Sequence, residues 1–482
     1  MTEEQWQLAF VDSVAASPTI RLSVHSGPAG PWTLRAGSRF DPPPLRRATP
    51  QSLLTDGAVP TSAAYDNRVI SLRLQLHTRG TQMVADPAAT QLQLLMRELD
   101  RPTNLLMLKA GTSAPVFFRT FRSGPDAIDW DPVNREASMS ILAEPFALGL
   151  EETLSGVVVT NDPAAGSNGL FLDITSPKGD VETPLFLTVS NGVVGTGRRR
   201  SAISLRRRGT PSATPLFLQA ESMTLASNVT LPGTDATMSG GGSSYARISY
   251  SGSTALIQRL STATRFPSSA STDARGIYRV FARIRQNTGA DVHTMRLRWG
   301  GADVQITNTT VAVPVDTGPS APTIKMIDLG IVQIPAGADP VERGLSGVEL
   351  VTEGVFLAVD AGRTSGSGTL DVDYLLLLPV DDRTMYVDWP ASATVTDFVV
   401  HGGAQPEVYA RNASAQITST QAITIAGTGL MITPNVTNRV FFHRDVGTGT
   451  SVAGTGDSVS ATTTLTPSYY PRYLGGFRPA TS

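Results

Sequence analysis

Apolar and polar residues alternate with a period of two along much of this 482-residue chain, and this pattern constrains its fold more than any other feature. Successive side chains of a β-strand point to opposite faces, so the alternation is typical of antiparallel strands with one buried face. Clusters of Gly, Pro, Asn, Asp and Ser separate the segments and indicate turns. The pattern predicts a mainly β protein, with its clearest strands at 19–25, 68–76, 116–121 and 138–144.

One segment departs from the period of two. Asp86 has the side chain of a helix N-cap, and Pro87 would occupy the first helical position. One apolar face then follows at helical spacing, formed by Leu92, Leu95, Met96 and Leu99. We therefore predict a single helix over 86–99, packed on a β domain that takes up residues 1–150.

The rest of the chain divides into three regions. Residues 216–380 contain strands and turns at fairly even spacing and no credible helix, which favours a closed sandwich or jelly roll. Residues 381–482 are predicted to form another small β unit, completed by strands from 151–215. We expect these two regions to form one β-sandwich together, with 216–380 inserted into it.

Composition excludes several function classes. The chain has no cysteine, which excludes disulfide scaffolds, thiolate zinc sites and cysteine nucleophiles. Its formal net charge of −2 argues against a polycation that binds nucleic acid. No apolar run approaches the roughly 20 residues that cross a bilayer, so no membrane insertion is expected. The chain also lacks the HExxH, GxSxG and phosphate-loop motifs.

Two charged patterns leave alternatives open. Asp371 and Asp373 are two residues apart and would share one face of a strand, but a glycosidase needs a second acid across a cleft, and none is apparent. We therefore predict no catalytic residue. Arginines at 198–200 and 206–208 flank a predicted strand. They favour a solvated or salt-bridged sheet edge, and the alternative is the lining of a channel or a subunit contact.

Aromatic residues are scarce, at 6% of the chain. Within 216–380 an exposed ring could stack on the apolar face of a sugar. Tyr278 lies in an alternating strand, where core packing is favoured. Trp299 precedes Gly300-Gly301 near a strand end, so a place at the rim and a place in the core both remain open.

Residues 1–215 and 381–482 resemble the distal tail proteins of long-tailed bacteriophages. GDVETPLFLTV is similar to the start of that family's galectin-like β-sandwich, and VFFHRD…SYYPRYLGG is similar to the ends of actinobacteriophage minor tail proteins. The segments that agree with the family in order and spacing are YDNRVISLRLQLHTRG (65–80), QLQLLMREL (91–99), LLMLKAG (105–111) and SMSILAEPFALG (138–149).

In that family the N-terminal β domain with its packed helix forms a hexameric ring. The ring caps the tail tube and bears the adhesion device. The resemblance thus implies a virion protein of the siphophage tail tip, made in the host cytoplasm. Its implied partners are five further copies of itself, the tail tube protein, hub or baseplate proteins and the tape measure protein.

Residues 216–380 resemble the jelly rolls of non-catalytic carbohydrate-binding modules, through QAESMTL (219–225), GIYRVFARIR (276–285) and LDVDYLLLLP (370–379). In that family an early Glu and a late Asp can ligate a structural Ca²⁺. Glu221 matches the first position, and Asp373, with Asp371 as the alternative, matches the second. Calcium takes six to eight oxygens, so backbone carbonyls would complete the shell. Trp299 and Tyr250 are the candidate sugar-binding residues.

Together these observations predict a structural protein that forms a hexameric ring at the tail tip. No cofactor is required, although the jelly roll could hold Ca²⁺ and contact host cell-wall glycans. Two rival hypotheses remain: an outer receptor-binding minor tail protein, and a glycan hydrolase or accessory protein associated with the tail. Glycan turnover would favour the hydrolase, and a copy number other than six would favour the outer subunit.

Overall fold

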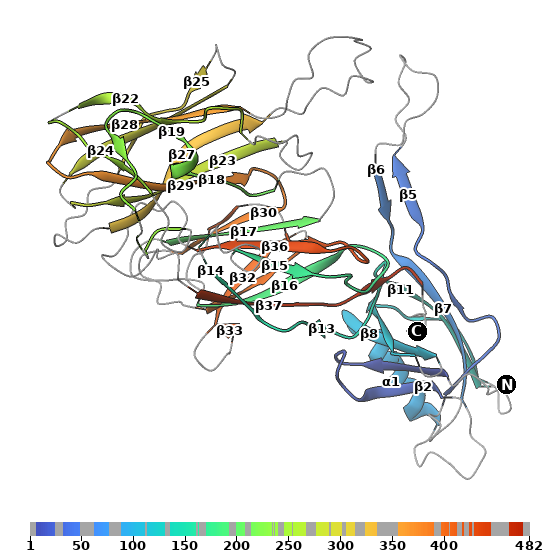
Figure 1. Cartoon of the computed structure of the whole chain (residues 1–482). Coiled ribbons are helices and arrows are strands. Elements are labelled where there is room, and N and C mark those ends of the chain that lie inside the picture. Colours follow the sequence, from blue (N-terminus) through green and yellow to red (C-terminus); the bar gives the residue numbers. More distant parts are fainter. Residues whose placement is uncertain are drawn as a thin grey trace, which may run out of the picture. The chain divides into compact units, whose positions relative to one another are not determined.

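The computed structural model divides the chain into two compact units (Figure 1). The first unit comprises residues 1–152, 178–183 and 470–482, and the second comprises 153–177 and 184–469. Strands dominate the described residues, so the mainly β prediction is confirmed. The structure describes residues 6–24, 32–48, 62–76, 88–110, 113–130, 135–160, 162, 170–191, 199–207, 214–233, 235, 237–239, 245–252, 254–266, 276–288, 291–300, 305–313, 323–334, 355–389, 397–403, 405–411, 417–418, 424–426, 429–444 and 462–475.

An eleven-stranded antiparallel sheet forms the first unit. Its main path runs β2-β1-β8-β9-β11-β7-β3, and β4, β10, β12 and β38 pair at its sides. Because β38 pairs with β12, a strand from the end of the chain completes this sheet. The strands are β1 (Trp6–Val11), β2 (Pro18–Val24), β3 (Trp32–Leu34), β4 (Arg39–Phe40), β7 (Arg68–Leu76), β8 (Thr103–Ala110), β9 (Val116–Phe121), β10 (Pro125–Trp130), β11 (Arg135–Ala143), β12 (Ala147–Leu148) and β38 (Arg472–Tyr473).

The predicted helix is present as α1 (Ala88–Leu99). Leu95 and Leu99 are buried in the core of the first unit, whereas Met96 is 44% exposed and lies outside the buried face. The predicted cap, Asp86 and Pro87, lies outside the described residues.

A separate two-stranded ribbon also belongs to the first unit. It consists of β5 (Leu45–Ala48) and β6 (Ser62–Tyr65), which pair only with each other among the described strands. Figure 1 shows this ribbon extending away from the eleven-stranded sheet.

Two further sheets pack face to face as a β-sandwich, whose core includes Leu187, Ile203, Phe398 and Phe442. Sheet one has eight strands and sheet two has five. Sheet one contains β13 (Glu152–Thr153), β14 (Val157–Thr160), β16 (Thr183–Ser190), β31 (Asp397–His401), β32 (Glu407–Arg411), β33 (Ile417–Thr418), β35 (Met431–Ile432) and β37 (Thr462–Tyr469). Sheet two contains β15 (Phe171–Ile174), β17 (Arg199–Arg207), β30 (Thr384–Trp389), β34 (Thr424–Ala426) and β36 (Asn438–His443).

A second sandwich takes all its strands from residues 216–379, the region predicted to be inserted. Sheets three and four have six strands each and enclose their own apolar core. Sheet three contains β18 (Leu216–Gln219), β20 (Val229–Thr230), β21 (Ala246–Ile248), β23 (Gly276–Gln286), β27 (Thr323–Ile334) and β29 (Leu370–Pro379). Sheet four contains β19 (Thr224–Leu225), β22 (Thr254–Ser261), β24 (Val292–Gly300), β25 (Gln305–Thr307), β26 (Val311–Ala312) and β28 (Phe356–Ser365), and a 3-10 helix (Ala220–Ser222) follows β18.

A third apolar cluster joins the two sandwiches. Phe281 and Tyr374 from sheet three pack with Phe441 and Ala202 from sheet two. Every residue of β29 is buried, because one face of this strand contacts sheet four and the other contacts sheet two. A strand covered on both faces has a continuous apolar run, which explains the segment LLLL at 375–378. The inserted sandwich is therefore packed against its host and not merely tethered to it.

The arginine-flanked strand is not a sheet edge, which corrects the prediction. It is β17, and it lies between β36 and β30 in the middle of sheet two. Its arginines still form ion pairs: Arg200 donates to both oxygens of Asp388, at 2.6 and 2.9 Å. Arg206 is buried and donates to Asp381 at 2.9 Å. Carboxylates on β30 and just before it neutralise these arginines, so the strand can occupy the middle of the sheet.

Candidate functional site

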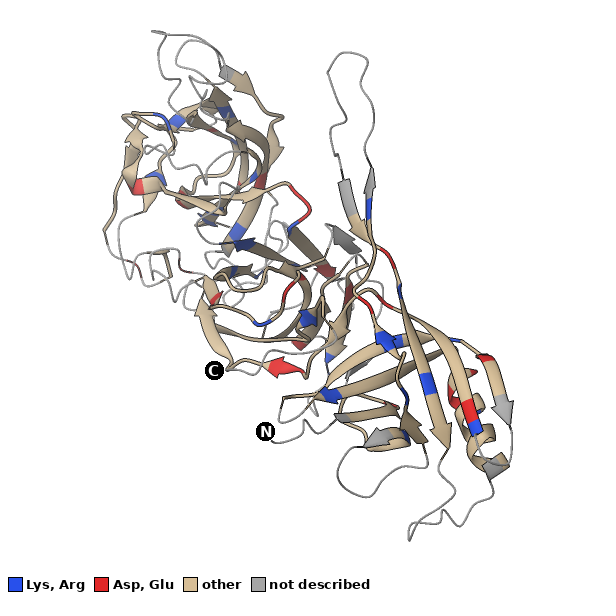
Figure 2. Cartoon of the chain, turned by 90° about the vertical axis from the view of Figure 1, so that its right-hand side faces the viewer, with Lys and Arg blue, Asp and Glu red and all other residues tan. Residues whose placement is uncertain are grey.

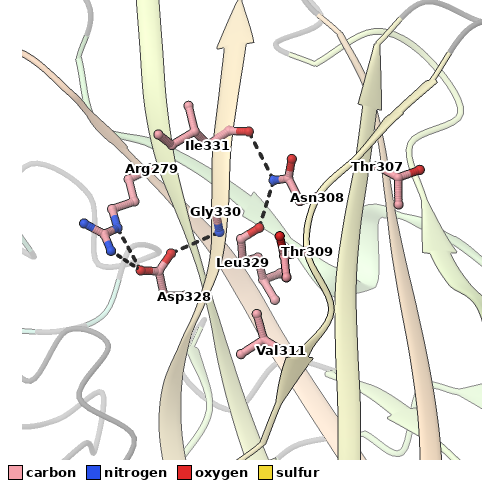
Figure 3. Close-up of a pocket in the computed structure, with 9 residues that line it drawn as sticks. All are labelled: Arg279, Thr307, Asn308, Thr309, Val311, Asp328, Leu329, Gly330 and Ile331. Atoms are coloured by element: carbon pink, nitrogen blue, oxygen red, sulfur yellow. Dashed lines mark hydrogen bonds and ion pairs between the residues drawn. The ribbon is translucent and has the colours of Figure 1, made fainter.

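A hollow of about 620 Å³ opens where the edge strand of sheet three passes the segment that joins β25 to β26 (Figure 3). Its two sides come from sequence segments about 20 residues apart. The lining residues are Arg279, Thr307, Asn308, Thr309, Val311, Asp328, Leu329, Gly330 and Ile331.

A bulge in β27 shapes one side of the hollow. Val280 pairs with Gly330 while Phe281 pairs with Asp328, so Leu329 is the extra residue. Gly330 has a φ of +92°, and a Cβ there would lie 2.9 Å from Asn308 Nδ2. Glycine is therefore required at this position, both for its backbone conformation and for the close approach of Asn308.

The Asn308 side chain fixes the other side. Its Nδ2 donates to the carbonyls of Leu329 and Ile331, at 2.8 and 3.1 Å. Its Oδ1 accepts a hydrogen bond from Trp299 Nε1 at 3.1 Å. The two carbonyl contacts, drawn in Figure 3, tie the segment after β25 to β27, and the bond from Trp299 ties it to β24.

The exposed groups around the hollow suit an uncharged ligand with several hydroxyls. Arg279 Nε donates to Asp328 Oδ2 at 2.7 Å, so the positive and negative charges of these two side chains offset each other at the hollow. Thr307 and Thr309 are exposed, and Ile331 is 51% exposed beside them. Paired acceptors and donors next to an apolar surface match the alternating hydroxyl and C–H faces of a sugar.

Neither of the two predicted sugar-binding residues, Trp299 and Tyr250, lines the hollow. Trp299 is partly buried, packs on the core of the inserted sandwich and reaches the hollow only through Asn308. Tyr250 is not among the lining residues of the hollow, and the guanidiniums of Arg259 and Arg363 lie over its ring, at 5.2 and 5.1 Å. No motif in the sequence pointed to Thr307, Asn308 or Thr309, because the hollow depends on a bulge and a long-range amide contact.

The predicted calcium ligands lie near each other, but an arginine contacts one of them. Asp373 is 1% exposed, forms an ion pair with the buried Arg283, and accepts hydrogen bonds from Ser239 N and Oγ. Glu221 Oε2 is buried with no hydrogen-bond partner, and burial, together with the charge of Asp373, raises the pKa of Glu221. The unpartnered Oε2 of Glu221 could accept a cation. The carboxylate of Asp373, in contrast, already has a positive partner in Arg283.

Both carboxylate oxygens of Asp371, the alternative calcium ligand, accept hydrogen bonds from arginines. Arg247 Nε donates to its Oδ1 at 2.8 Å, and Arg285 Nη2 donates to its Oδ2 at 2.7 Å. Among the described residues, no group of three or more His, Asp or Glu side chains could hold a metal ion.

Comparison with known proteins gave matches among solved structures only. No family model matches the chain, and no curated protein matches it. The crystal structure of the Dit protein of phage SPP1, described as a paradigm of the hub adsorption apparatus of phages that infect Gram-positive bacteria, is 12% identical; it covers 42% of this chain and 71% of its own, with a TM-score of 0.26.

Two structures of the phage p2 baseplate in its activated conformation are also similar. The structure with Sr is 8% identical, covers 77% of this chain and 97% of its own, and has a TM-score of 0.21. The structure with Ca is 10% identical, covers 78% and 98%, and has a TM-score of 0.19. None of the described helices is long and apolar enough to cross a membrane.

Proposed function

We propose that this chain is a structural protein of a siphophage tail tip. Six copies form a ring through the first unit and join the tail tube to the adhesion or baseplate apparatus. The inserted sandwich contacts host-surface glycans through the hollow described above. The protein breaks no bond.

The observation that carries the proposal is the ribbon of β5 and β6. A two-stranded hairpin is marginally stable alone in water, and this one has no third strand among the described residues. Leu45 and Tyr65 pair across it and are 41% and 38% exposed. A second copy of the chain would cover these side chains and stabilise the ribbon.

A second exposed pair lies on the eleven-stranded sheet. Val69 of β7 is directly opposite Leu142 of β11, and the two are 48% and 40% exposed. Exposed apolar side chains that adjoin one another favour a protein contact. Head-to-tail contacts between identical units close into a ring when the rotation between copies divides a full turn.

The charge distribution agrees with a protein partner. Figure 2 shows Lys and Arg interspersed with Asp and Glu along the described strands. A surface of mixed charge favours neither nucleic acid nor an anionic membrane.

The rigid packing of the inserted sandwich supports its role as an adhesive lobe. Since sheet three packs on sheet two, the hollow keeps a fixed orientation relative to the host sandwich. Weak sugar sites gain strength when several linked copies act together, because linkage raises the effective concentration. Six copies would therefore turn a weak contact into stable attachment.

The glycan contact gives a testable prediction. Thr309→Val removes one exposed hydroxyl and preserves shape, so the affinity of one site for host cell-wall oligosaccharide should fall about 3- to 10-fold, as expected for one neutral hydrogen bond. Glycan-array screening followed by calorimetry measures this. Thr224→Val, at an exposed threonine of β19, is the matched control and should bind like the unchanged protein. Equal binding by both variants would place any sugar site elsewhere.

The calcium site at Glu221 and Asp373 stays a prediction. When bound there, Ca²⁺ would neutralise the orphan carboxylate oxygen of Glu221. A rise in the unfolding midpoint on adding Ca²⁺, absent in Glu221→Gln, is the result expected from such a site.

The role in the virion is tested by labelling phage particles that carry this chain with gold-coupled antibodies. We expect gold at the junction of tube and tip. Label confined to outer fibres would instead favour a receptor-binding subunit, and glycan turnover by the purified protein would favour a hydrolase.

A further inference from the structure

A lysine is buried inside the inserted sandwich. The chain has 39 Lys and Arg residues, and only Lys109, Lys178 and Lys325 are lysines. Lys325, on β27, is 1% exposed. An amine differs from a guanidinium because it can lose its proton and then act as a nucleophile. The buried lysine is therefore a reactive group in the interior of this sandwich, and neither the glycan contact nor the ring contact uses it.

The amine of Lys325 contacts the side-chain amide of Gln286. Its Nζ donates to Gln286 Oε1 at 3.1 Å. Gln286 is the last residue of β23 and is 0% exposed. Lys325 lies opposite Ile284 in the pairing of β27 with β23, so Lys325 and Gln286 share one face of neighbouring strands. Because Cδ of the amide is bonded directly to Oε1, the amine lies beside an electrophilic carbon.

The orientation of the amide is fixed from its other end. Gln286 Nε2 donates to the backbone carbonyl of Asp291 at 2.6 Å. Asp291 is itself held by the backbone, since its carboxylate accepts from Ser367 N at 3.0 Å and from Gly368 N at 2.8 Å. The amide thus directs its oxygen towards Lys325 and its nitrogen towards Asp291. Two reacting groups held in one geometry react far faster than the same groups in solution.

The surroundings of the contact favour an uncharged amine. Lys325, Gln286, Asp291 and His293 are each at most 1% exposed. Burial disfavours the charged form of an amine, and the neutral form has the lone pair that attacks a carbonyl carbon. Burial lowers the pKa of His293 to about 4, and the charge of Lys325 in its ammonium form contributes to this shift. Near neutral pH the imidazole therefore has one N–H and one acceptor nitrogen, and it can relay a proton.

We propose that Lys325 and Gln286 join in an intramolecular isopeptide bond after the inserted sandwich has folded. Nζ of the neutral lysine attacks Cδ of Gln286, and the new C–N bond replaces the bond between Cδ and Nε2. One proton moves from Nζ to the departing nitrogen, either directly or through the imidazole of His293, and one ammonia leaves. The reaction consumes no oxidant, reductant or second substrate, and it changes only the chain itself.

The bond would fasten an edge strand. β27 lies at the edge of sheet three and carries the Gly330 bulge that shapes the hollow. The chain has no cysteine, so a disulfide cannot hold this strand. A covalent link between β23 and β27 restricts the unfolded chain as a disulfide does, and it should raise the unfolding midpoint. The bond is independent of glycan contact at the hollow and of ring assembly.

Intact mass spectrometry of the full chain under denaturing conditions tests this proposal. We expect a mass that is lower than that of the unmodified chain by one ammonia. Peptide mapping after digestion should give one branched peptide that contains both Gln286 and Lys325, in place of two linear peptides. The unmodified mass, retained after prolonged incubation of the folded protein, would overturn the proposal.

Two variants make the test specific. Lys325→Met removes the nucleophile, so it should keep the mass of an unmodified chain and unfold at a lower temperature than the unchanged protein. Lys178→Met is the matched control, because Lys178 is half-exposed and paired with Glu152, and it should still lose one ammonia. If Lys325→Met does not fold, the branched peptide from the unchanged protein decides. Loss of ammonia from folded Lys325→Met would show that the reaction occurs elsewhere and would contradict the proposal.

Discussion

The double substitution Val69→Lys and Leu142→Glu is expected to convert the ring into monomers. The two positions are opposite each other on β7 and β11, so the new side chains form an oppositely charged cross-strand pair. Since both native side chains are about half exposed, the fold of one copy should tolerate the change. Burying two charges in a copy-to-copy contact is costly, and assembly should fail.

Analytical ultracentrifugation with far-ultraviolet circular dichroism measures both parts of this expectation. Val158→Lys, which alters a 52%-exposed valine in sheet one, is the control and should assemble normally. A double variant that assembles like the unchanged protein would show that this surface is not the ring contact.

The second large effect is expected from Arg283→Met. Arg283 and Asp373 are each 1% exposed and form an ion pair inside the second unit. Removing one partner leaves a buried uncompensated carboxylate, which typically costs about 3–5 kcal/mol in the free energy of unfolding. Denaturant unfolding, followed by tryptophan fluorescence, should show this loss.

Arg247→Met is the matched control. Arg247 is 32% exposed, and its partner Asp371 keeps a second arginine, Arg285. The expected loss is about 1 kcal/mol or less. Equal losses for both variants would contradict the assignment of Arg283 as the essential counter-ion. If calcium performs that role, a chelator should destabilise the unchanged protein and added Ca²⁺ should rescue Arg283→Met.

Local patterns in the sequence were sufficient for the strands and the helix. The period of two identified β7 and β11, and helical spacing identified α1, because each pattern reflects one face buried in a core. The same reasoning failed for β17. Its flanking arginines suggested a sheet edge, but Asp388 and Asp381, which lie 188 and 175 residues away in sequence from their partners, neutralise them within a central strand.

The candidate site was less predictable, because it depends on tertiary contacts. Trp299 was identified as an aromatic near a strand end, and the structure places it behind the hollow, where it bonds Asn308. Asn308 carries no sequence signal, since its role arises only when β27 bulges at Gly330. Tyr250 was identified by residue type, yet the arginines over its ring come from β22 and β28.

The mass of the purified protein in solution, combined with class averages of the particles in negative stain, tests the central claim most directly. We expect a species of six copies, about 305 kDa from a chain of 50.9 kDa, seen as a closed ring. A monodisperse monomer at every concentration, unchanged when tail tube protein is added, would contradict it.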